Sequence, residues 1–333
     1  MLATTLLIVV FFAILILGHE LGHYLAARLL HMEVQEFGFG LPPKIIGRKF
    51  GKTEYSLNII PFGGFVKIED LEPVDMSPDT ETRKERAPIW KRTVVFASGV
   101  AMNFLIGWLA FSFIFMMGVP KAVYVSGLVA DSPAAVSGIK AGDRLVDFEN
   151  VDQLTSFVQS HADENISWNI DRYGEKISVV AAPRVMDGVA RIGVELIESG
   201  FPKQGLFQSL GSGFLTTGQF TGKIFSALAG MFRHGDFSSS SGPVGIFNAV
   251  SIAKDMGLAY FLQLMGVVSL NLMIINILPL PALDGGHLLF LAIEKIRRKP
   301  ISIKAQSAIN STSFILLLIL MFVVTIRDVI NLF

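Results

Sequence analysis

Two histidines and a glutamate lie on adjacent turns of a helix that the sequence predicts near the start of the chain. In the segment GHELGHYLAARLL (18–30), His19, Glu20 and His23 form the pattern His-Glu-x-x-His. Side chains at positions i and i+4 of an α-helix share one face, with Cβ atoms about 5–6 Å apart, so both histidines can reach one cation. Glu20 is offset by about 100° and can meet a water molecule bound to that ion. The spacing predicts a metal site at which a carboxylate moves a proton.

A catalytic zinc site usually has three protein ligands and one open position, so a third ligand is needed. The chain contains no cysteine, which leaves His, Asp and Glu as candidates. In the segment NLMIINILPLPALDGGHLLF (271–290), Pro279 and Pro281 break an apolar helix. Such a break is tolerated in a membrane only where it is buried in protein or lines a wet cavity. We expect Asp284, which follows this break, to be the third ligand, with His287 as the alternative.

The composition predicts an integral membrane protein. The chain of 333 residues is 51% hydrophobic and only 17% charged, whereas about 25% charged residues are typical of soluble domains. About 20 helical residues cross a bilayer core, so four apolar segments are candidate spans, although the fourth is short. The net charge is zero, and no nucleic-acid partner is expected. The candidate spans cover residues 6–30, 93–119, 258–278 and 312–326.

The basic residues predict the orientation in the membrane. Ten Lys and Arg residues lie between residues 44 and 92, and five lie between residues 295 and 304. With four spans these two loops face the same side, which the positive-inside rule makes cytoplasmic. Both termini and the segment 120–257 are then extracytoplasmic, and the metal site lies toward the cytoplasmic face.

The segment 120–200 has the character of a separate folded module. Short β-prone runs alternate with turn residues, as in a compact β-rich domain. The stretch DSPAAVSGIKAGDRLVDFENV (131–151) resembles a PDZ domain, a module that binds extended peptides by adding them to a sheet edge. The following segment, 201–257, has an amphipathic helical pattern. We expect it to lie on the outer membrane surface or to pack under the external module.

Taken together, these motifs resemble the site-2 protease family of intramembrane zinc metalloproteases. The match rests on His-Glu-Leu-Gly-His at 19–23 and on Asn276, Pro279, Pro281 and Leu-Asp-Gly at 283–285. The PDZ-like module between the second and third spans is similar to the bacterial type that regulates sigma factors. The stretches FGFG (37–40), IPFGGFVKIED (60–70) and SGVAMNF (98–104) also match.

The resemblance implies roles for the motif residues. His19, His23 and Asp284 would ligate Zn²⁺, and Glu20 would be the general base. Asn276 would contact the substrate backbone, although an interhelical hydrogen bond is its alternative role.

A hairpin that enters the membrane would hold the unwound substrate as an added strand. The resemblance places this function at Gly63, Gly64 and Phe65.

The resemblance also implies the substrates and the location. The family cuts transmembrane segments of single-pass proteins that an upstream site-1 protease has already trimmed, such as anti-sigma factors, and it clears signal-peptide remnants. The enzyme would act in regulated intramembrane proteolysis, in a stress response, in the bacterial inner membrane. The PDZ region would exclude untrimmed substrates. Many proteobacterial members carry two tandem PDZ domains, whereas residues 120–200 have room for one.

We therefore expect a polytopic α-helical membrane protein with four transmembrane helices, a membrane-associated β-hairpin and one extracytoplasmic PDZ-like α+β domain. Residues 1–119 would form the first part of the membrane domain, 120–200 the PDZ-like domain, 201–257 the amphipathic segment and 258–333 the second part of the membrane domain.

The polar motif has three alternative interpretations. A hydrogen-bonded structural cluster would not need two histidines at metal-ligand spacing around a glutamate. A metal or proton transporter predicts an inverted repeat with broken helices in both halves, whereas the sequence shows one broken span and no internal repeat. A PDZ adaptor without catalysis would not need Glu20.

Overall fold

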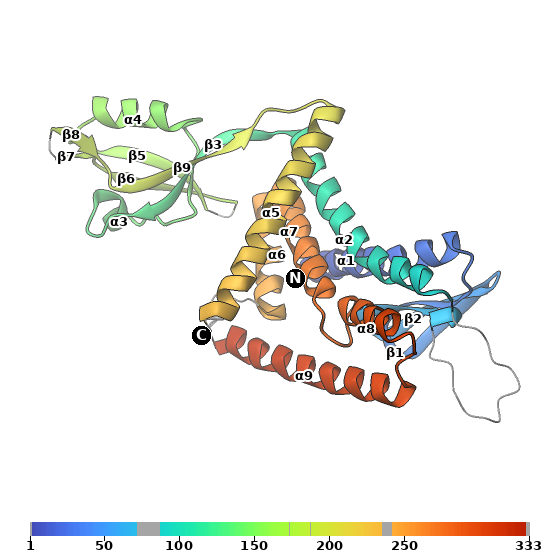
Figure 1. Cartoon of the computed structure of the whole chain (residues 1–333). Helices are drawn as coiled ribbons and strands as arrows, with labels where there is room; N and C mark the ends of the chain where they lie inside the picture. The colour runs from blue at the N-terminus through green and yellow to red at the C-terminus, as the bar shows by residue number, and fades with distance from the viewer. Residues whose placement is uncertain (1, 72–86, 173, 187, 235–241, 331–333) are drawn as a thin grey trace, which may run out of the picture. The chain divides into compact units, whose positions relative to one another are not determined.

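The computed structural model describes residues 2–71, 87–172, 174–186, 188–234 and 242–330 (Figure 1). The chain divides into two compact units. The first comprises Met1–Phe111, Phe214–Ser251 and Gln263–Phe333, and the second comprises Ser112–Gly213 and Ile252–Leu262. Three of the basic residues that support the predicted orientation, Arg83, Lys84 and Arg86, lie outside the described residues.

Four helices among the described residues are long and apolar enough to cross a membrane. They are α1 (Leu2–Leu29), α2 (Ile89–Met117), α7 (Leu258–Ile277) and α9 (Ile303–Ile330). Their number agrees with the prediction, and the chain is a multi-pass membrane protein. The apolar stretch of α9, Lys304–Asp328, is longer than the predicted 312–326. Polar residues such as Gln306, Asn310 and Ser311 lower the hydropathy at its start but lie beside a cavity.

A long, bent hairpin connects α1 to α2. It consists of β1 (Val34–Phe50) and β2 (Thr53–Ile68), followed by the short 3₁₀ helix η1 (Glu69–Leu71). Both strands fold back on themselves, so Phe37 lies opposite Val66 on one side and opposite Tyr55 on the other. The last part of β2, residues 64–68, pairs only with the first part of β1. Its other edge has no strand partner among the described residues.

The helix break predicted after α7 is present. Residues 278–283 form no helix, and α8 (Asp284–Arg297) then begins at the predicted metal ligand. Only glycine fits at position 285, because a Cβ there would lie 2.1 Å from the carbonyl oxygen of Leu278. The Gly-Gly pair thus lets α8 start directly against the end of α7.

Two further helices belong to the segment between the PDZ-like sequence and α7. They are α5 (Leu206–His234) and α6 (Pro243–Met256). Phe214 of α5 packs edge-on against Phe104 and Trp108 of α2. Near the end of α9, the Asp328 carboxylate accepts a hydrogen bond from the backbone N–H of Gly245 at 2.8 Å. A location on the membrane surface stays a prediction for this segment.

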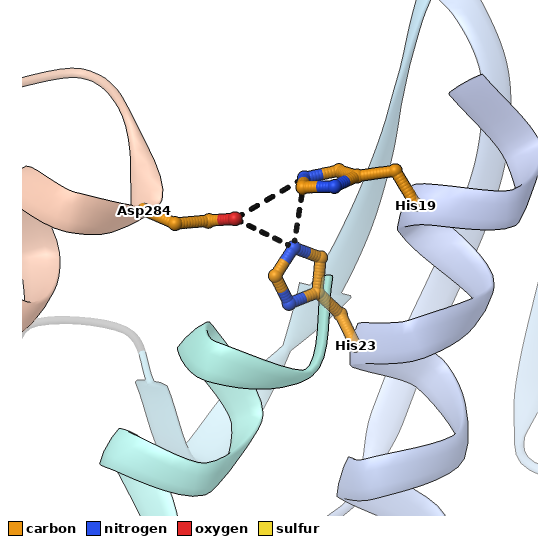
Figure 2. A group of neighbouring side chains, drawn as sticks. All are labelled: His19, His23 and Asp284. Carbon is orange, nitrogen blue, oxygen red and sulfur yellow. Dashed lines mark hydrogen bonds and ion pairs between the residues drawn. The ribbon is translucent and has the colours of Figure 1, made fainter. Parts of the chain in front are cut away.

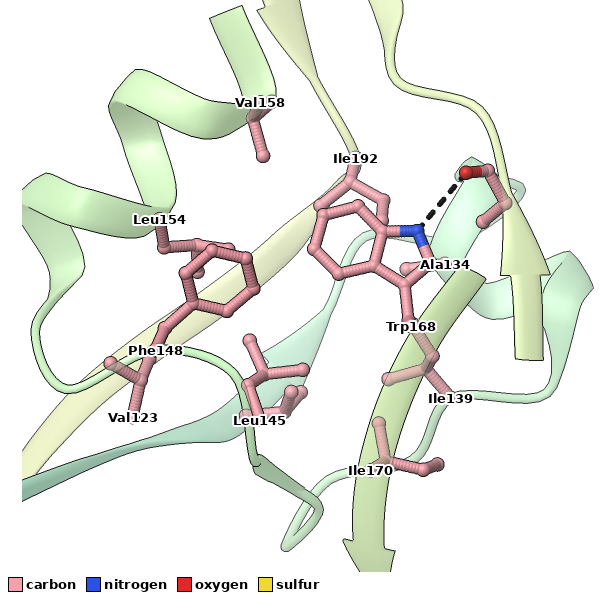
Figure 3. Close-up of a cluster of buried hydrophobic side chains, with 12 residues drawn as sticks. Val123, Ala134, Ile139, Leu145, Phe148, Leu154, Val158, Trp168, Ile170 and Ile192 are labelled. Atoms are coloured by element: carbon pink, nitrogen blue, oxygen red, sulfur yellow. Dashed lines mark hydrogen bonds between the residues drawn. The ribbon is translucent and has the colours of Figure 1, made fainter. Parts of the chain in front are cut away.

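The second unit contains a five-stranded antiparallel sheet in the order β6-β5-β4-β3-β9. A buried cluster fills its core around Trp168, whose indole N–H donates to the Ala181 carbonyl at 3.0 Å (Figure 3). The strands of the sheet are β3 (Val119–Leu128), β4 (Arg144–Leu145), β5 (Ile166–Arg172), β6 (Glu175–Ala181) and β9 (Val194–Phe201). The unit also contains α3 (Pro133–Ser137), α4 (Val151–Ser160) and the small hairpin β7 (Arg184–Met186) and β8 (Val189–Arg191).

The Gly-Asp turn of this unit has a structural function. Asp143 is 1% exposed and forms an ion pair with Arg172 at 2.7 Å. Its carboxylate also accepts from the backbone N–H of Lys140 at 2.8 Å, and Gly142 adopts a φ of 95°. The buried carboxylate thus ties the turn before β4 to the end of β5.

Candidate metal centre

Three electron-rich atoms from two distant parts of the chain face one point (Figure 2). The Nε2 atoms of His19 and His23, both on α1, lie 3.3 Å apart. The Oδ2 atom of Asp284, the first residue of α8, lies 3.2 Å from His19 Nε2 and 3.4 Å from His23 Nε2. The three residues form a near-equilateral triangle.

This triangle has the size that a zinc ion requires. A tetrahedral ion with bonds of about 2.0–2.1 Å places neighbouring ligand atoms about 3.3–3.4 Å apart. The Asp284 Oδ2 atom is buried and forms no hydrogen bond within the described residues. A bound cation would satisfy this oxygen, and two imidazoles with one carboxylate are a usual donor set for zinc.

The backbone of α2 fixes the direction of the second histidine. The Nδ1 atom of His23 lies 2.7 Å from the carbonyl oxygen of Val95. A carbonyl only accepts, so Nδ1 carries the proton and donates. In the neutral imidazole Nε2 then has a free lone pair directed at the centre of the triangle, which is the tautomer that a metal needs.

A buried asparagine of α2 contacts the first histidine. The side-chain amide of Asn103 is fully buried, and its nitrogen lies 3.2 Å from His19 Nδ1. Its oxygen has no hydrogen-bond partner among the described residues. Turning the amide by 180° exchanges the two atoms and lets the oxygen accept from Nδ1–H. Asn103 can therefore hold His19 in the tautomer that leaves Nε2 free.

A glycine on the same face of α2 leaves room for both imidazoles. A Cβ at position 99 would lie 2.4 Å from His23 Nε2 and 2.7 Å from His19 Cε1. Val95, Gly99 and Asn103 are spaced by four residues and form one stripe along α2. This stripe supplies no ligand, but it faces both histidines.

Asp284 would bind a cation as the carboxylate, because metal ligands must be deprotonated.

His287, the alternative third ligand, is placed differently. Its ring stacks on Phe96 of α2, with the two ring centres 4.6 Å apart and the planes 4° from parallel. Burial lowers the pKa of this histidine, which favours the neutral ring. Within the described residues, the group that could share one ion comprises His19, His23 and Asp284, without His287.

One cavity of about 480 Å³ collects every residue predicted for the site. Glu20 lines it together with the three residues of the triangle. Asn276 of α7 also lines it, and its side-chain nitrogen lies 3.5 Å from His19 Nε2. The predicted hairpin residues Gly63, Gly64 and Phe65 form a further part of its wall.

The hairpin presents an unpaired strand edge to this cavity. Residues 64–68 of β2 pair on one side only, and the wall of the cavity includes Gly64, Val66 and Ile68. A Cβ at position 64 would lie 2.8 Å from Glu20 Cγ. The glycine therefore brings the strand backbone close to the glutamate.

The site predicted from the sequence does not include the supporting residues of α2. Asn103 lies within SGVAMNF, and a polar residue in an apolar span is the signal that could have identified it. The Val95 carbonyl carries no sequence signal, because any residue has one. Gly99 is ambiguous in a sequence, since glycine is also common in membrane helices.

Comparisons with known proteins identify the family. The chain matches the pattern of "Peptidase family M50" over residues 7–320. It is 34% identical to a "Putative zinc metalloprotease" of Clostridium perfringens over 330 residues, with 96% of each chain covered. A protein of the same description from Brucella suis is 30% identical, with 95% of this chain and 92% of that protein covered. "Zinc metalloprotease RasP" of Geobacillus kaustophilus is 27% identical, with 96% of each chain covered. This chain belongs to peptidase family M50, the site-2 proteases, and is a zinc metalloendopeptidase.

Proposed function

We propose that this protease hydrolyses peptide bonds within or near the transmembrane segments of single-pass proteins. The supporting observation is that the triangle of His19, His23 and Asp284 shares one cavity with Glu20 and an unpaired strand edge, beside helices apolar enough to cross a membrane. Anti-sigma factors and signal-peptide remnants are the substrate classes to which the family resemblance points.

The three residues of the triangle would hold the zinc ion. When bound, zinc supplies Lewis-acid activation of water and of the scissile carbonyl group. The hydrogen bond from His23 to Val95 and the contact of His19 with Asn103 keep the two rings turned toward the ion. The ionised Asp284 supplies the negative charge that balances part of the charge of the metal.

Glu20 would move the proton. It lies one residue after His19, offset by about 100° around the helix axis. Its carboxylate takes a proton from the attacking water and delivers it to the leaving amine nitrogen. No other carboxylate lines the cavity besides Asp284, within the described residues.

A helical substrate hides its carbonyl groups within its own hydrogen bonds, so it must unwind before hydrolysis. The free edge of β2 beside Gly63, Gly64 and Phe65 can pair with the exposed backbone and keep it extended. The Asn276 side-chain nitrogen, which faces the same cavity, can donate to the substrate carbonyl oxygen as negative charge develops there.

The rest of the chain would select substrates. In this proposal residues 120–200 form an extracytoplasmic PDZ-like domain that admits only proteins already trimmed by an upstream site-1 protease. The basic loops set the orientation, with both termini outside and the metal centre toward the cytoplasm. The enzyme would thus act in the bacterial inner membrane, in regulated intramembrane proteolysis during a stress response.

The test uses the full-length protein, purified in detergent with zinc. A single-pass peptide that lacks most of its extracytoplasmic part is the substrate, and the products are mapped by mass spectrometry. We expect the wild type to cut within or near the apolar segment. Glu20→Gln should retain about one zinc per chain and lose cleavage by several orders of magnitude, because only the proton carrier is removed.

Two outcomes would contradict the proposal. Unchanged turnover by Glu20→Gln would refute the assignment of the base. Cleavage of soluble peptides alone, with the membrane-spanning peptide left intact by the wild type, would refute the substrate class.

A further inference from the structure

A second cavity of about 460 Å³ lies directly beside the catalytic one. The two share part of their walls, namely Val66, Ile68, Leu71, Phe96 and His287. The stacked rings of Phe96 and His287 stand at this shared boundary. The catalytic cavity therefore has an adjoining chamber that no proposed catalytic residue uses.

The wall of the second cavity contains polar side chains from three helices. Four polar residues of α9 line it, namely Gln306, Ser307, Asn310 and Ser311. Arg92 of α2 and Glu294 of α8 also line it and form a two-fold hydrogen-bonded ion pair at 2.8 and 3.1 Å. Polar side chains in a membrane helix generally face protein or a wet cavity, so this face of α9 is built around the chamber.

The free edge of β2 runs from one cavity into the other. Gly63, Gly64 and Phe65 line the catalytic cavity only, Val66 and Ile68 line both, and Lys67 lines the second only. An extended chain rises about 3.3 Å per residue. A polypeptide paired along this edge beside the triangle would therefore enter the second cavity within a few residues.

We propose that the second cavity binds the part of the substrate polypeptide next to the scissile bond on the side of the basic loops. This inference rests on the proposed function, because it assumes a substrate strand on the edge of β2. The cavity lies at that side, since it includes Ile301 of the basic segment 295–304. In the proposed orientation the bound segment is the cytoplasmic flank of the substrate, extended and polar.

The chemistry of the wall suits such a segment. The flank leaves the apolar core and exposes backbone N–H and C=O groups once it is extended. The amides of Gln306 and Asn310 and the hydroxyls of Ser307 and Ser311 both donate and accept, so they can replace water around either group. These side chains would form hydrogen bonds with the main chain of the substrate and not with its side chains. The cavity would therefore accept flanks of many different sequences.

Chemical cross-linking tests this proposal. The chain contains no cysteine, so each single-cysteine variant carries one reactive thiol at a known position. Ser307→Cys is placed in the Glu20→Gln background, which should hold an uncut substrate. The substrate is the peptide cleaved by the wild type, with one cysteine four residues from the mapped scissile bond, on either the cytoplasmic or the extracytoplasmic side. A short bismaleimide joins the cysteines. We expect several-fold more cross-linking with the cytoplasmic-side peptide.

Ile309→Cys is the matched control. It lies at the same level of α9, two residues away, is 41% exposed and does not line the cavity. It should cross-link weakly with both peptides. Equal yields at positions 307 and 309, or equal yields with the two peptides, would overturn the proposal. Absence of cross-linking at position 307 would also overturn it and leave a cavity that holds only water.

A filling variant gives an independent readout. Ser311→Trp should raise KM several-fold for a peptide with a long cytoplasmic flank and leave KM unchanged for one that ends two residues beyond the scissile bond. Equal effects on both peptides would count against the cavity as a flank site. If the wild type cleaves no membrane-spanning peptide, the proposed function fails, whereas cleavage without these effects contradicts only the second-cavity assignment.

Discussion

The Nδ1 atom of His23 lies 2.7 Å from the carbonyl oxygen of Val95, a residue of a different membrane helix. This contact fixes which ring nitrogen carries the proton, so α2 determines how a residue of α1 faces the metal centre. Asn103 contacts His19 in a similar position two turns further along α2. The geometry of the centre thus depends on a helix that supplies none of its candidate ligands.

The identity of the third ligand can be tested by zinc content. Loss of a residue that only hydrogen-bonds to a metal ligand typically lowers metal affinity about 10–100-fold. Asp284→Ala should lower zinc affinity by more than this, because it removes a ligand. His287→Ala should keep the ion, because its ring stacks on Phe96 outside the triangle. Metal analysis after dialysis against a weak chelator measures both. Zinc loss in His287→Ala with full occupancy in Asp284→Ala would reverse the assignment.

The space left by Gly99 can be filled. In Gly99→Ala the new methyl group would lie 2.4 Å from His23 Nε2, so an imidazole must shift and zinc binding should fall at least about tenfold. The control is Gly107→Ala on the same helix. Its nearest neighbour is the flexible side chain of Leu270 at 3.0 Å, and zinc binding should stay near the wild-type value. Equal zinc affinity in the two variants would contradict the steric argument.

Asn103 can be replaced by a residue of similar size without hydrogen-bonding groups. Asn103→Leu should lower zinc affinity about 10–100-fold, because His19 loses its partner. The spectrum of the cobalt-substituted protein should change as well, which a loss of helix packing alone would not cause.

Ser269→Ala controls for helix packing in this experiment. The Ser269 hydroxyl donates to the backbone carbonyl of Asn103 at 2.8 Å and, among the described residues, forms no hydrogen bond with a histidine. This variant should leave the cobalt spectrum unchanged. An altered spectrum in Ser269→Ala together with an unaltered one in Asn103→Leu would refute the positioning role.

The hairpin carries a carboxylate whose ionisation should affect stability. Burial raises the pKa of Glu36, but Lys44, 2.8 Å away, outweighs this effect and keeps the pKa below the ordinary value of 4.5. A lowered carboxyl pKa stabilises the fold above the unfolded-state value, and the contribution disappears as the pH falls through the folded-state value. Glu36→Gln should therefore melt slightly below the wild type at pH 7. The two melting curves should converge below pH 4.5, whereas a constant difference would contradict this assignment.

The sequence predicts the candidate ligands and the general base of the centre better than the residues of α2 that hold the ligands in place. His19, Glu20 and His23 lie within five residues of one another, so the geometry of a single helix is enough to bring them together. A helix break and a shared membrane depth predict that Asp284 meets these histidines, and the three side chains lie close together. Their role as zinc ligands stays a prediction.

Other features depend on close packing and could not be read in this way. A hydropathy value depends on the residue type alone and not on what surrounds the side chain. The predicted fourth span therefore omits the polar start of α9, although Asn310 and Ser311 line a cavity there. The doubled strand pairing of Phe37 is likewise invisible to alternation patterns, since both halves of the hairpin are β-prone.

The stripe formed by Val95, Gly99 and Asn103 has a consequence for how this protein tolerates change. A survey of all single substitutions along α2 would find intolerance at positions 99 and 103, where a side chain must be absent and an amide must be present. At Val95 the oxygen that contacts His23 belongs to the main chain, so apolar replacements of similar size that keep the helix and its buried packing should be tolerated. An enzyme redesigned for another metal would need new residues on this stripe before any ligand is exchanged.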